Sequence, residues 1–289
     1  MNTTTPKIAV IVEGAVTEPL IFNNLNKLFF SNATGRSTFE IVTFQFRSHI
    51  YSFFNTLKTY LDTESPFDTI ALLQECIKEN KSSFLDSFSV GELERLLNYK
   101  RNEFSEIFLF FDYELQHPAK KKHDMLCKLM EVFSNETENG KLYINYPMVE
   151  ALQDTGLDRP CYERCLVSKD DCRDHKYKNW VKDNFTSTDI ENYCEAKWQL
   201  FCKTAVRKLS CLLAEKYPSY DILNNIPIMS FQEYRRASCQ RELYDGQYRD
   251  YISTSQNNPK VMVLSSIPLF LLDYFQEPFW AKMLTSPSI

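Results

Sequence analysis

Residues 8–12 read IAVIV, and this uninterrupted apolar run decides the fold. A run of this kind is typical of a central strand in a parallel sheet, because helices cover both faces of such a strand. The run ends at Glu13, and residues 17–19 (TEP) are expected to begin a helix, with Thr17 as its N-cap and a proline in the first turn. The sequence therefore predicts a strand, a turn that carries carboxylates, and a helix.

Three more stretches have strand patterns. Residues 107–111 (IFLFF) form a second continuous apolar run, residues 39–46 alternate between apolar and polar, and residues 142–146 (LYINY) form a further strand. Residues 121–133, between two of these strands, have the pattern of a helix. Because strands and helices alternate along the chain, we predict an α/β fold with a mostly parallel sheet flanked by helices.

The rest of the chain is predicted to be mainly helical. We expect residues 1–152 to form the core, with a helical insertion at about residues 50–103 that is long for a simple crossover. Residues 153–289 are expected to be a mainly helical C-terminal extension that completes the core. Its clearest segments are a long helix over 189–216, a strand-like stretch at 261–264 and a buried helix at 268–275.

The composition indicates a folded protein with a sizeable core. Of the 289 residues, 44% are hydrophobic and 14% are aromatic, and only 6 are glycine. The net charge of −5 excludes general attraction to a polyanion, so any nucleic-acid substrate would require a local basic patch or bound cations. Basic clusters such as residues 120–123 are interpreted as solvated helical faces.

The nine cysteines are interpreted as reduced thiols of a cytoplasmic protein. The N-terminal residues lead directly into a strand and do not have the pattern of a secretion signal. No apolar run approaches the roughly 18 residues that a membrane-spanning helix needs. We therefore expect no membrane association.

Acidic residues follow several of the predicted strands. Glu13 ends the first strand, Asp112 and Glu114 follow the second apolar run, and Glu150 follows residues 142–146; Glu18 lies at the start of the first helix. The carboxyl ends of parallel strands are where such sheets bind ligands. Converging carboxylates repel one another unless a cation neutralises them, and oxygen ligands suit Mg²⁺ or Mn²⁺. Taken singly, Glu18 and Glu150 are equally well explained as helix-cap or solvated loop residues.

Three segments resemble the motifs of TOPRIM-type domains. Residues 11–22 (IVEGAVTEPLIF) resemble the first motif, in which a glutamate after strand one precedes a glycine and a helix. Residues 108–114 (FLFFDYE) resemble the second motif, whose usual form is Asp-x-Asp, and residues 146–152 (YPMVEAL) resemble a third acidic position. That third position is seen in defence-associated members: the OLD-family nucleases, the RloB-like proteins and the nuclease effector of the PARIS anti-phage system. The resemblance covers about residues 7–152.

The resemblance implies a metal-dependent nuclease. Glu13 would be the catalytic or metal-binding glutamate, Asp112 and Glu114 would bind the metal, and Glu18 and Glu150 would complete the cluster. One or two Mg²⁺ or Mn²⁺ ions would support hydrolysis of phosphodiester bonds in DNA or RNA, with tRNA as one candidate, while Glu13 orients the water or acts as base. A lysine or arginine, with residues 120–122 as candidates, would neutralise the phosphate.

By the same resemblance, the chain would be the toxic effector of a bacterial anti-phage system. No Walker motif is present, so an ABC-type ATPase or sensor would have to be a separate partner chain. A homo-oligomer is among the expected states. Glu114 departs from the family pattern, because Asp is more common there. This departure supports the alternative of a catalytically silent TOPRIM-like subunit that serves interaction or regulation.

Two other groups of residues have weaker patterns. Cys161, Cys165, Cys172 and His175 form a C-x3-C-x6-C-x2-H array that could hold structural zinc, but ordinary reduced cysteines are the favoured interpretation. Aromatic and basic residues of segment 241–251 could stack on nucleic-acid bases, although a half-buried amphipathic helix is favoured; they are Arg241, Tyr244, Tyr248, Arg249 and Tyr251. Neither a nucleophile elbow nor a glycine-rich phosphate loop is present.

Overall fold

The chain forms two compact units. The computed structural model describes residues 6–31, 39–61, 67–78, 95–115, 119–155, 165–185, 189–214, 226–254 and 257–285. The sheet unit comprises Met1–Phe111, Asp124–Leu142 and Ile190–Asn192, and the helical unit comprises Asp112–His123, Tyr143–Asp189 and Tyr193–Ile289. The units interleave along the chain, so that segments on both sides of residue 152 belong to the helical unit.

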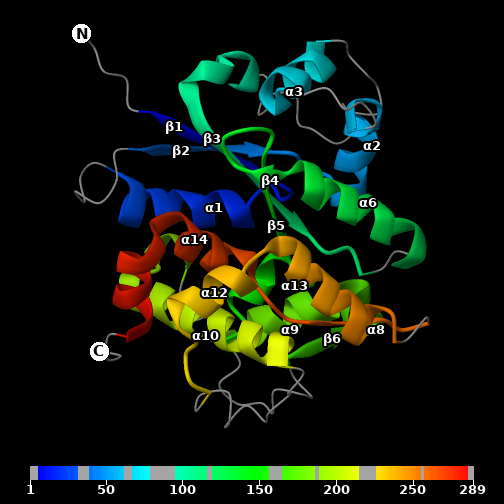
Figure 1. The fold of residues 1–289 in the computed structure, drawn as a ribbon, viewed down its shortest axis with the longest axis vertical. Coiled ribbons are helices and arrows are strands. Elements are labelled where there is room, and N and C mark those ends of the chain that lie inside the picture. Colours follow the sequence, from blue (N-terminus) through cyan, green and yellow to red (C-terminus); the bar gives the residue numbers. More distant parts are fainter. Residues whose placement is uncertain are drawn as a thin grey trace. The chain divides into compact units, whose positions relative to one another are not determined.

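A mostly parallel sheet of five strands, in the order β2-β1-β3-β5-β4, establishes the α/β class (Figure 1). Strand β1 pairs in parallel with β2 on one side and with β3 on the other, while β4 is antiparallel to β5. The strands are β1 (Lys7–Val12), β2 (Glu40–Gln45), β3 (Phe104–Asp112), β4 (Ser134–Asn135) and β5 (Gly140–Asn145). The helices and turns that accompany them are α1 (Thr17–Leu25), η1 (Asn26–Phe30), α2 (Ile50–Leu61), α3 (Thr69–Lys78), η3 (Arg101–Glu103), α6 (Ala119–Val132) and η6 (Ile190–Asn192).

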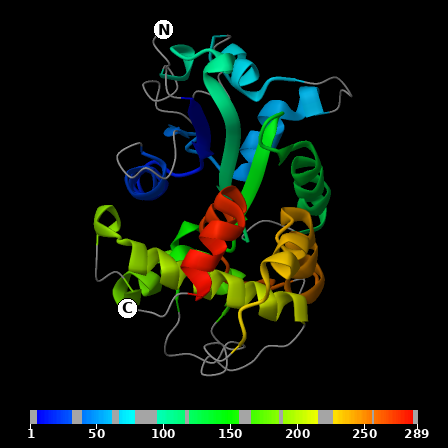
Figure 2. The same cartoon turned by 60° about the vertical axis from the view of Figure 1, so that its left-hand side comes forward.

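Helices cover both faces of the sheet, as the apolar runs predict. Successive side chains of a strand point to opposite faces. Phe110 of β3 packs against Phe22 of α1 with ring centroids 4.7 Å apart, whereas Phe111 packs against Phe53 of α2 at 5.0 Å. Figure 2 shows α1 on one face of the sheet and α2 with α6 on the other. Each fully buried phenylalanine contributes about 1.5–3 kcal/mol through removal of its surface from water.

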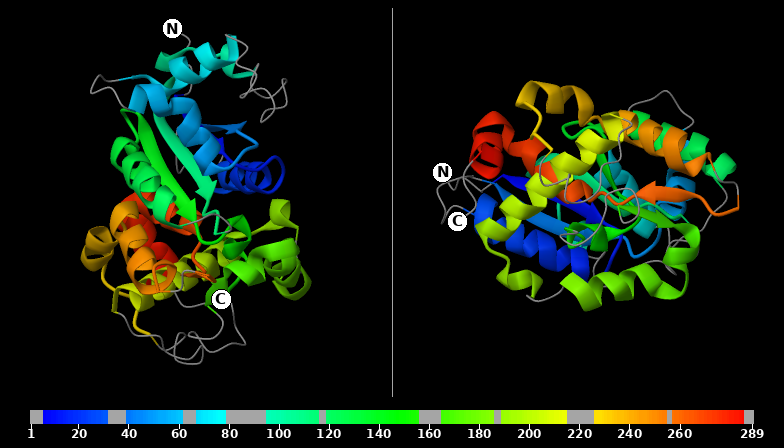
Figure 3. Two further views of the ribbon diagram at one scale, coloured as in Figure 1. Left: turned by 90° about the vertical axis from the view of Figure 1, so that its right-hand side faces the viewer. Right: turned by 90° about the horizontal axis from the view of Figure 1, so that it is seen from below.

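The helical unit is built around the long helix α10, on which α12, α13 and α14 pack (Figure 3). The buried side chains of α10 recur at helical spacing, among them Trp198, Phe201, Ala205 and Leu209. The elements of this unit are η4 (Val149–Leu152), β6 (Leu166–Ser168), α8 (Lys169–Cys172), η5 (Arg173–His175), α9 (Lys176–Phe185), α10 (Glu195–Ala214), α12 (Phe231–Ala237), α13 (Gln240–Gln247), η7 (Tyr248–Ile252), β7 (Lys260–Met262), α14 (Ser266–Trp280) and η8 (Ala281–Thr285).

The structure corrects several details of the sequence prediction. Thr17 is the first residue of α1, and Val16 occupies the N-cap without a side-chain hydrogen bond. Strand β3 begins three residues earlier than the apolar run, at Phe104. The strand-like stretch near residue 261 pairs in a separate antiparallel sheet with β6, which the sequence did not reveal because three residues are too few for a periodic pattern. Within the predicted helical insertion, α2 and α3 are helical, and residues 62–66 and 79–94 lie outside the described residues.

The eight cysteines that the structure describes are reduced thiols, and five of them are buried. Across the described ranges of the chain, every helix is too short or too polar to span a lipid bilayer. Both observations agree with what the sequence led us to expect of the thiols and of membrane spans.

Gly140 is held in a conformation that other residues adopt only with strain. Its φ is +118°, and a Cβ there would lie 2.7 Å from Leu109 Cδ1 and 3.1 Å from Ile107 Cγ2.

We predict that Gly140→Ala lowers the free energy of unfolding by about 1–3 kcal/mol. Gly246 in α13 is the matched control: a Cβ there meets Leu212 at 3.5 Å, an ordinary contact, so Gly246→Ala should be neutral or stabilise by about 0.5–1 kcal/mol. Urea unfolding of both variants measures this, and equal effects would contradict the prediction.

Candidate metal centre

The carboxyl ends of β1 and β3 are neighbours in the sheet. The backbone N–H of Glu13, the residue after β1, donates to the Phe110 carbonyl oxygen at 3.0 Å. Asp112 is the last residue of β3, two positions beyond Phe110. On the other side of β1, the Phe46 N–H donates to the Val12 carbonyl oxygen at 2.7 Å. Half-buried Glu13 therefore extends from the end of a central strand, as the sequence predicted.

Glu18 closes the turn between β1 and α1. Its side chain is only 3% exposed, and its Oε1 accepts the backbone N–H of Gly14 at 2.8 Å. A Cβ at residue 14 would overlap the Glu18 carboxylate, so a glycine is needed for this close approach. The positive end of the α1 dipole also favours a carboxylate in the first turn. This local role explains both residues without a metal ion.

Asp112 is held by a buried amide. Asn145, the last residue of β5, is 1% exposed, and its Nδ2 donates to Asp112 Oδ1 at 3.3 Å. The backbone carbonyl oxygen of Asn145 also accepts the Tyr113 N–H at 2.9 Å. Asn145 was not among the site residues predicted from the sequence; its signal there is a polar amide at the end of an otherwise apolar strand.

Glu114 lies near the ammonium of Lys122 in α6. Burial lowers the pKa of Lys122 to about 8, and the negative charge of Glu114 opposes that shift. Between this value and the ordinary 10.5, the unfolded chain binds more protons than the folded chain, so the contribution of Lys122 to the free energy of unfolding increases as pH rises through that window. Among residues 120–122, only the Lys122 side chain is described, and it is half-buried.

Glu150 forms an ion pair with Lys178 of α9, with 2.7 Å between Glu150 Oε1 and Lys178 Nζ. The glutamate side chain is 9% exposed and the lysine side chain 49%. Because a carboxylate removed from water needs a compensating charge or hydrogen bond, Lys178 explains the burial of Glu150. These two residues are 28 positions apart, and no sequence pattern predicts their pairing.

The predicted metal ligands are divided between the two units. Glu13 and Glu18 belong to the sheet unit, whereas Asp112, Glu114 and Glu150 belong to the helical unit. Within the residues that the structure describes, no three His, Cys, Asp or Glu side chains gather closely enough to hold a metal ion. Mg²⁺ nevertheless often uses only one or two protein carboxylates, with waters and substrate phosphates as its other ligands, and the oxygen donors of Asp112 and Glu114 suit it. The metal centre stays a prediction.

The aromatic residues after β3 form a stacked array in the helical unit. Tyr113 stacks on Tyr146 with centroids 5.5 Å apart, and His123 stacks on Tyr248 at 3.9 Å. His123 Nδ1 also lies 3.1 Å from the Tyr244 hydroxyl.

Of the proposed base-stacking tyrosines, Tyr244 and Tyr251 are buried and Tyr248 is half-buried, which confirms the half-buried helix. The two arginines of this segment pair with acids: Arg241 with Asp245 and Arg249 with Asp250.

The zinc array is only partly described. Cys165 and Cys172 are buried and His175 is exposed, while Cys161 lies outside the described residues. Burial, with the nearby charges of Asp171 and Glu114, raises the pKa of Cys172 to about 12. The zinc site therefore stays a prediction, because one of its four residues lies outside the described residues.

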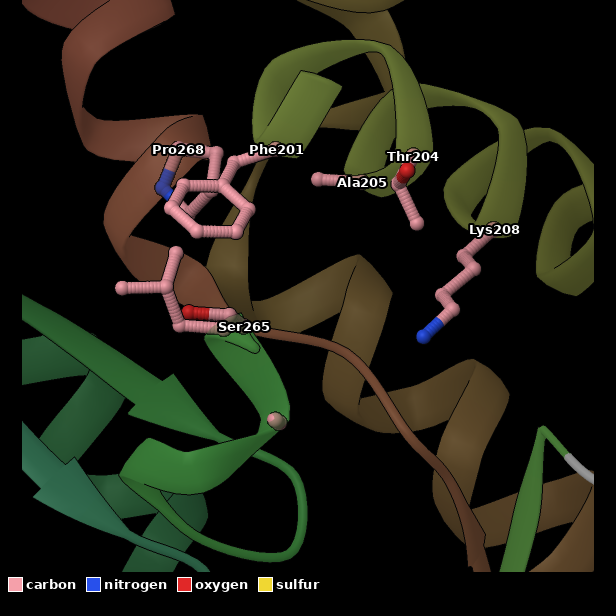
Figure 4. Close-up of a pocket in the computed structure, with 8 residues that line it drawn as sticks. Phe201, Thr204, Ala205, Lys208, Ser265 and Pro268 are labelled. Carbon is pink, nitrogen blue, oxygen red and sulfur yellow. The ribbon is translucent and has the colours of Figure 1, made fainter. Parts of the chain in front are cut away.

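A small pocket in the helical unit adjoins Asn145 through Ser265 (Figure 4). Phe201 and Pro268 form part of its apolar wall, and Lys208 extends toward it from α10. Lys208 is 2% exposed, and its Nζ donates to the backbone carbonyl oxygen of Asp154 at 2.6 Å. The described residues that line the pocket include no acid, so the pocket is distinct from the predicted carboxylate ligands.

We predict that Glu114→Gln moves the pKa of Lys122 below its value of about 8, because the substitution removes the negative charge that raises it. NMR titration of the lysine side-chain carbons measures the shift. Glu131→Gln, at an exposed position of the same helix, is the control and should leave the Lys122 titration unchanged. A Lys122 pKa that is equal in the wild type and in Glu114→Gln would show that the two charges do not interact.

The chain matches no protein-family model, and no curated protein or solved structure is significantly similar to it. The resemblance to TOPRIM-type domains therefore depends on three short segments and on the order of strands and acids.

Proposed function

We propose that the chain is a metal-dependent nuclease of TOPRIM type that hydrolyses phosphodiester bonds in DNA or RNA. The observation that carries the proposal is the adjacency of the carboxyl ends of β1 and β3, where the Glu13 N–H donates to the Phe110 carbonyl oxygen. Glu13 directly follows β1, and Asp112 is the last residue of β3. In a parallel sheet this is the edge at which ligands bind.

The proposed roles follow from the chemistry of each side chain. Asp112 and Glu114 hold Mg²⁺ or Mn²⁺. The bound ion, when present, supplies Lewis-acid stabilisation of charge on the phosphate. Glu13 orients the attacking water and accepts its proton. Lys122 is the described cation near Glu114, and because its pKa is about 8 its ammonium is mostly protonated at neutral pH and can contact a phosphate oxygen.

The biological role rests on the resemblance alone. We propose that the chain acts in the bacterial cytoplasm as the toxic effector of an anti-phage system, restrained by a separate ABC-type ATPase or sensor protein. A toxic nuclease requires such restraint. Purification of the chain from its native host tests this proposal, since an ATPase should co-purify at a fixed stoichiometry; a chain that purifies alone and active would exclude constitutive restraint.

A catalytically silent interaction subunit is the second candidate. It is favoured by the contacts of Glu18 and Glu150, because both acids bind donors of this chain, the Gly14 N–H and Lys178. The two functions differ in one measurable outcome. A nuclease cleaves single-stranded DNA, duplex DNA, tRNA or other RNA when Mg²⁺ or Mn²⁺ is added, whereas a silent subunit cleaves none of these.

We predict that Glu13→Ala and Asp112→Asn each reduce metal-dependent cleavage on the order of 100-fold or more, because each removes a group that acts on the reacting phosphate or water. Single-turnover cleavage of labelled DNA and RNA measures the loss. Glu242→Ala, at an exposed acid of α13, is the matched control and should cleave at the wild-type rate. Retention of full activity by Glu13→Ala would refute the assignment of Glu13.

A further inference from the structure

Asn145 connects the end of β3 with the start of α14. Its side chain is 1% exposed and lies between Asp112 and two consecutive serines. Its Oδ1 accepts hydrogen bonds from the Ser266 N–H at 3.1 Å, the Ser266 hydroxyl at 3.0 Å and the Ser265 hydroxyl at 3.3 Å. Every polar atom of this buried amide therefore contributes to one network.

The network fixes the orientation of the amide. A backbone N–H can only donate, so the atom of Asn145 that faces the Ser266 N–H must be the carbonyl oxygen. The NH₂ group then necessarily faces Asp112, where its Nδ2 lies 3.3 Å from Oδ1. A flipped amide would place two donors against each other at α14 and two acceptors against each other at Asp112. The direction of the hydrogen bond to Asp112 is thus set by the start of α14.

Two further features strengthen this arrangement. The Tyr113 N–H donates to the Asn145 carbonyl oxygen, so the backbone beside Asp112 is held by the same residue as its side chain. Ser265 is the N-cap of α14, and the Asn145 Oδ1 accepts from the first residue of that helix. The positive end of the helix dipole polarises the amide and makes its NH₂ group a stronger donor toward the carboxylate.

We propose that Asn145 is a positioning residue, which holds one oxygen of Asp112 so that the carboxylate is oriented for a divalent cation before the cation binds. This inference rests on the proposed function. Hydrogen-bond partners of metal-ligating carboxylates orient them, and loss of such a partner typically weakens metal binding about 10–100-fold. The start of α14, more than 150 positions beyond Asp112 in the sequence, would then determine the affinity of the metal centre.

The experiment compares Asn145→Ala with Gln247→Ala. Gln247 is a buried amide of the same unit whose Nε2 and Oε1 bond the Met262 carbonyl oxygen and N–H, both at 2.8 Å, without contact to Asp112. Both substitutions remove buried hydrogen bonds and should lower the Tm. Only Asn145→Ala should weaken Mn²⁺ binding, by about 10–100-fold in calorimetric titration. Ser266→Ala, which removes one hydroxyl and keeps the backbone donor, is a milder variant that should weaken binding by a smaller factor.

Binding and cleavage separate the two proposals. Weaker Mn²⁺ binding by Asn145→Ala than by Gln247→Ala supports the positioning role, even if no variant cleaves nucleic acid and the nuclease proposal fails. Equal Mn²⁺ affinity in Asn145→Ala, Gln247→Ala and the wild type overturns the positioning role, and cleavage by the wild type would then leave the nuclease proposal standing. A crystal structure of Asn145→Ala without metal provides a second readout: an Asp112 carboxylate that keeps its wild-type orientation also overturns the inference.

Discussion

Strands β1 and β3 are apolar on both faces, and this constraint organises the sheet unit. Helices must cover both sides of the sheet, as Phe110 and Phe111 show by packing against α1 and α2 in turn. Polar side chains are then excluded from residues 8–12 of β1 and 107–111 of β3, so acids near their carboxyl ends can occur only after these apolar runs. Because β1 and β3 are parallel neighbours, their carboxyl ends lie at the same edge of the sheet, which is the edge where parallel sheets bind ligands.

The acids that the sequence singled out are not equivalent once their contacts are known. Glu18 accepts the Gly14 N–H and closes a turn, and Glu150 is neutralised by Lys178. These contacts give both residues a structural role that needs no cation. Asp112 and Glu114 differ, since one is held by a neutral amide and the other lies near a lysine whose pKa is lowered by burial.

The amide network at the end of β5 shows how distant segments determine local geometry. The hydrogen bond from the Ser266 N–H at the start of α14 fixes the orientation of the Asn145 amide, and Asn145 Nδ2 donates one hydrogen bond to Asp112. Because the backbone N–H of Ser266 can only donate, it fixes which atom of the Asn145 amide accepts and therefore which atom donates to Asp112. The helical C-terminal segment thus contributes to the proposed metal centre through hydrogen bonding, although its own described residues beside Asn145 are serines and carry no charge.

The sequence by itself determined the α/β class, the two central strands and the acids at their ends, because a strand buried on both faces must be a continuous apolar run. It also predicted α14 and the long helix α10 from their apolar residues. Only the tertiary structure decided that Glu18 closes a turn, that Glu150 meets Lys178, and that Asn145 holds Asp112. These outcomes depend on which side chains meet across the fold. The periodicity of apolar residues indicates which faces of a helix or strand are buried. It does not indicate which residue will form a hydrogen bond or ion pair with a buried polar group.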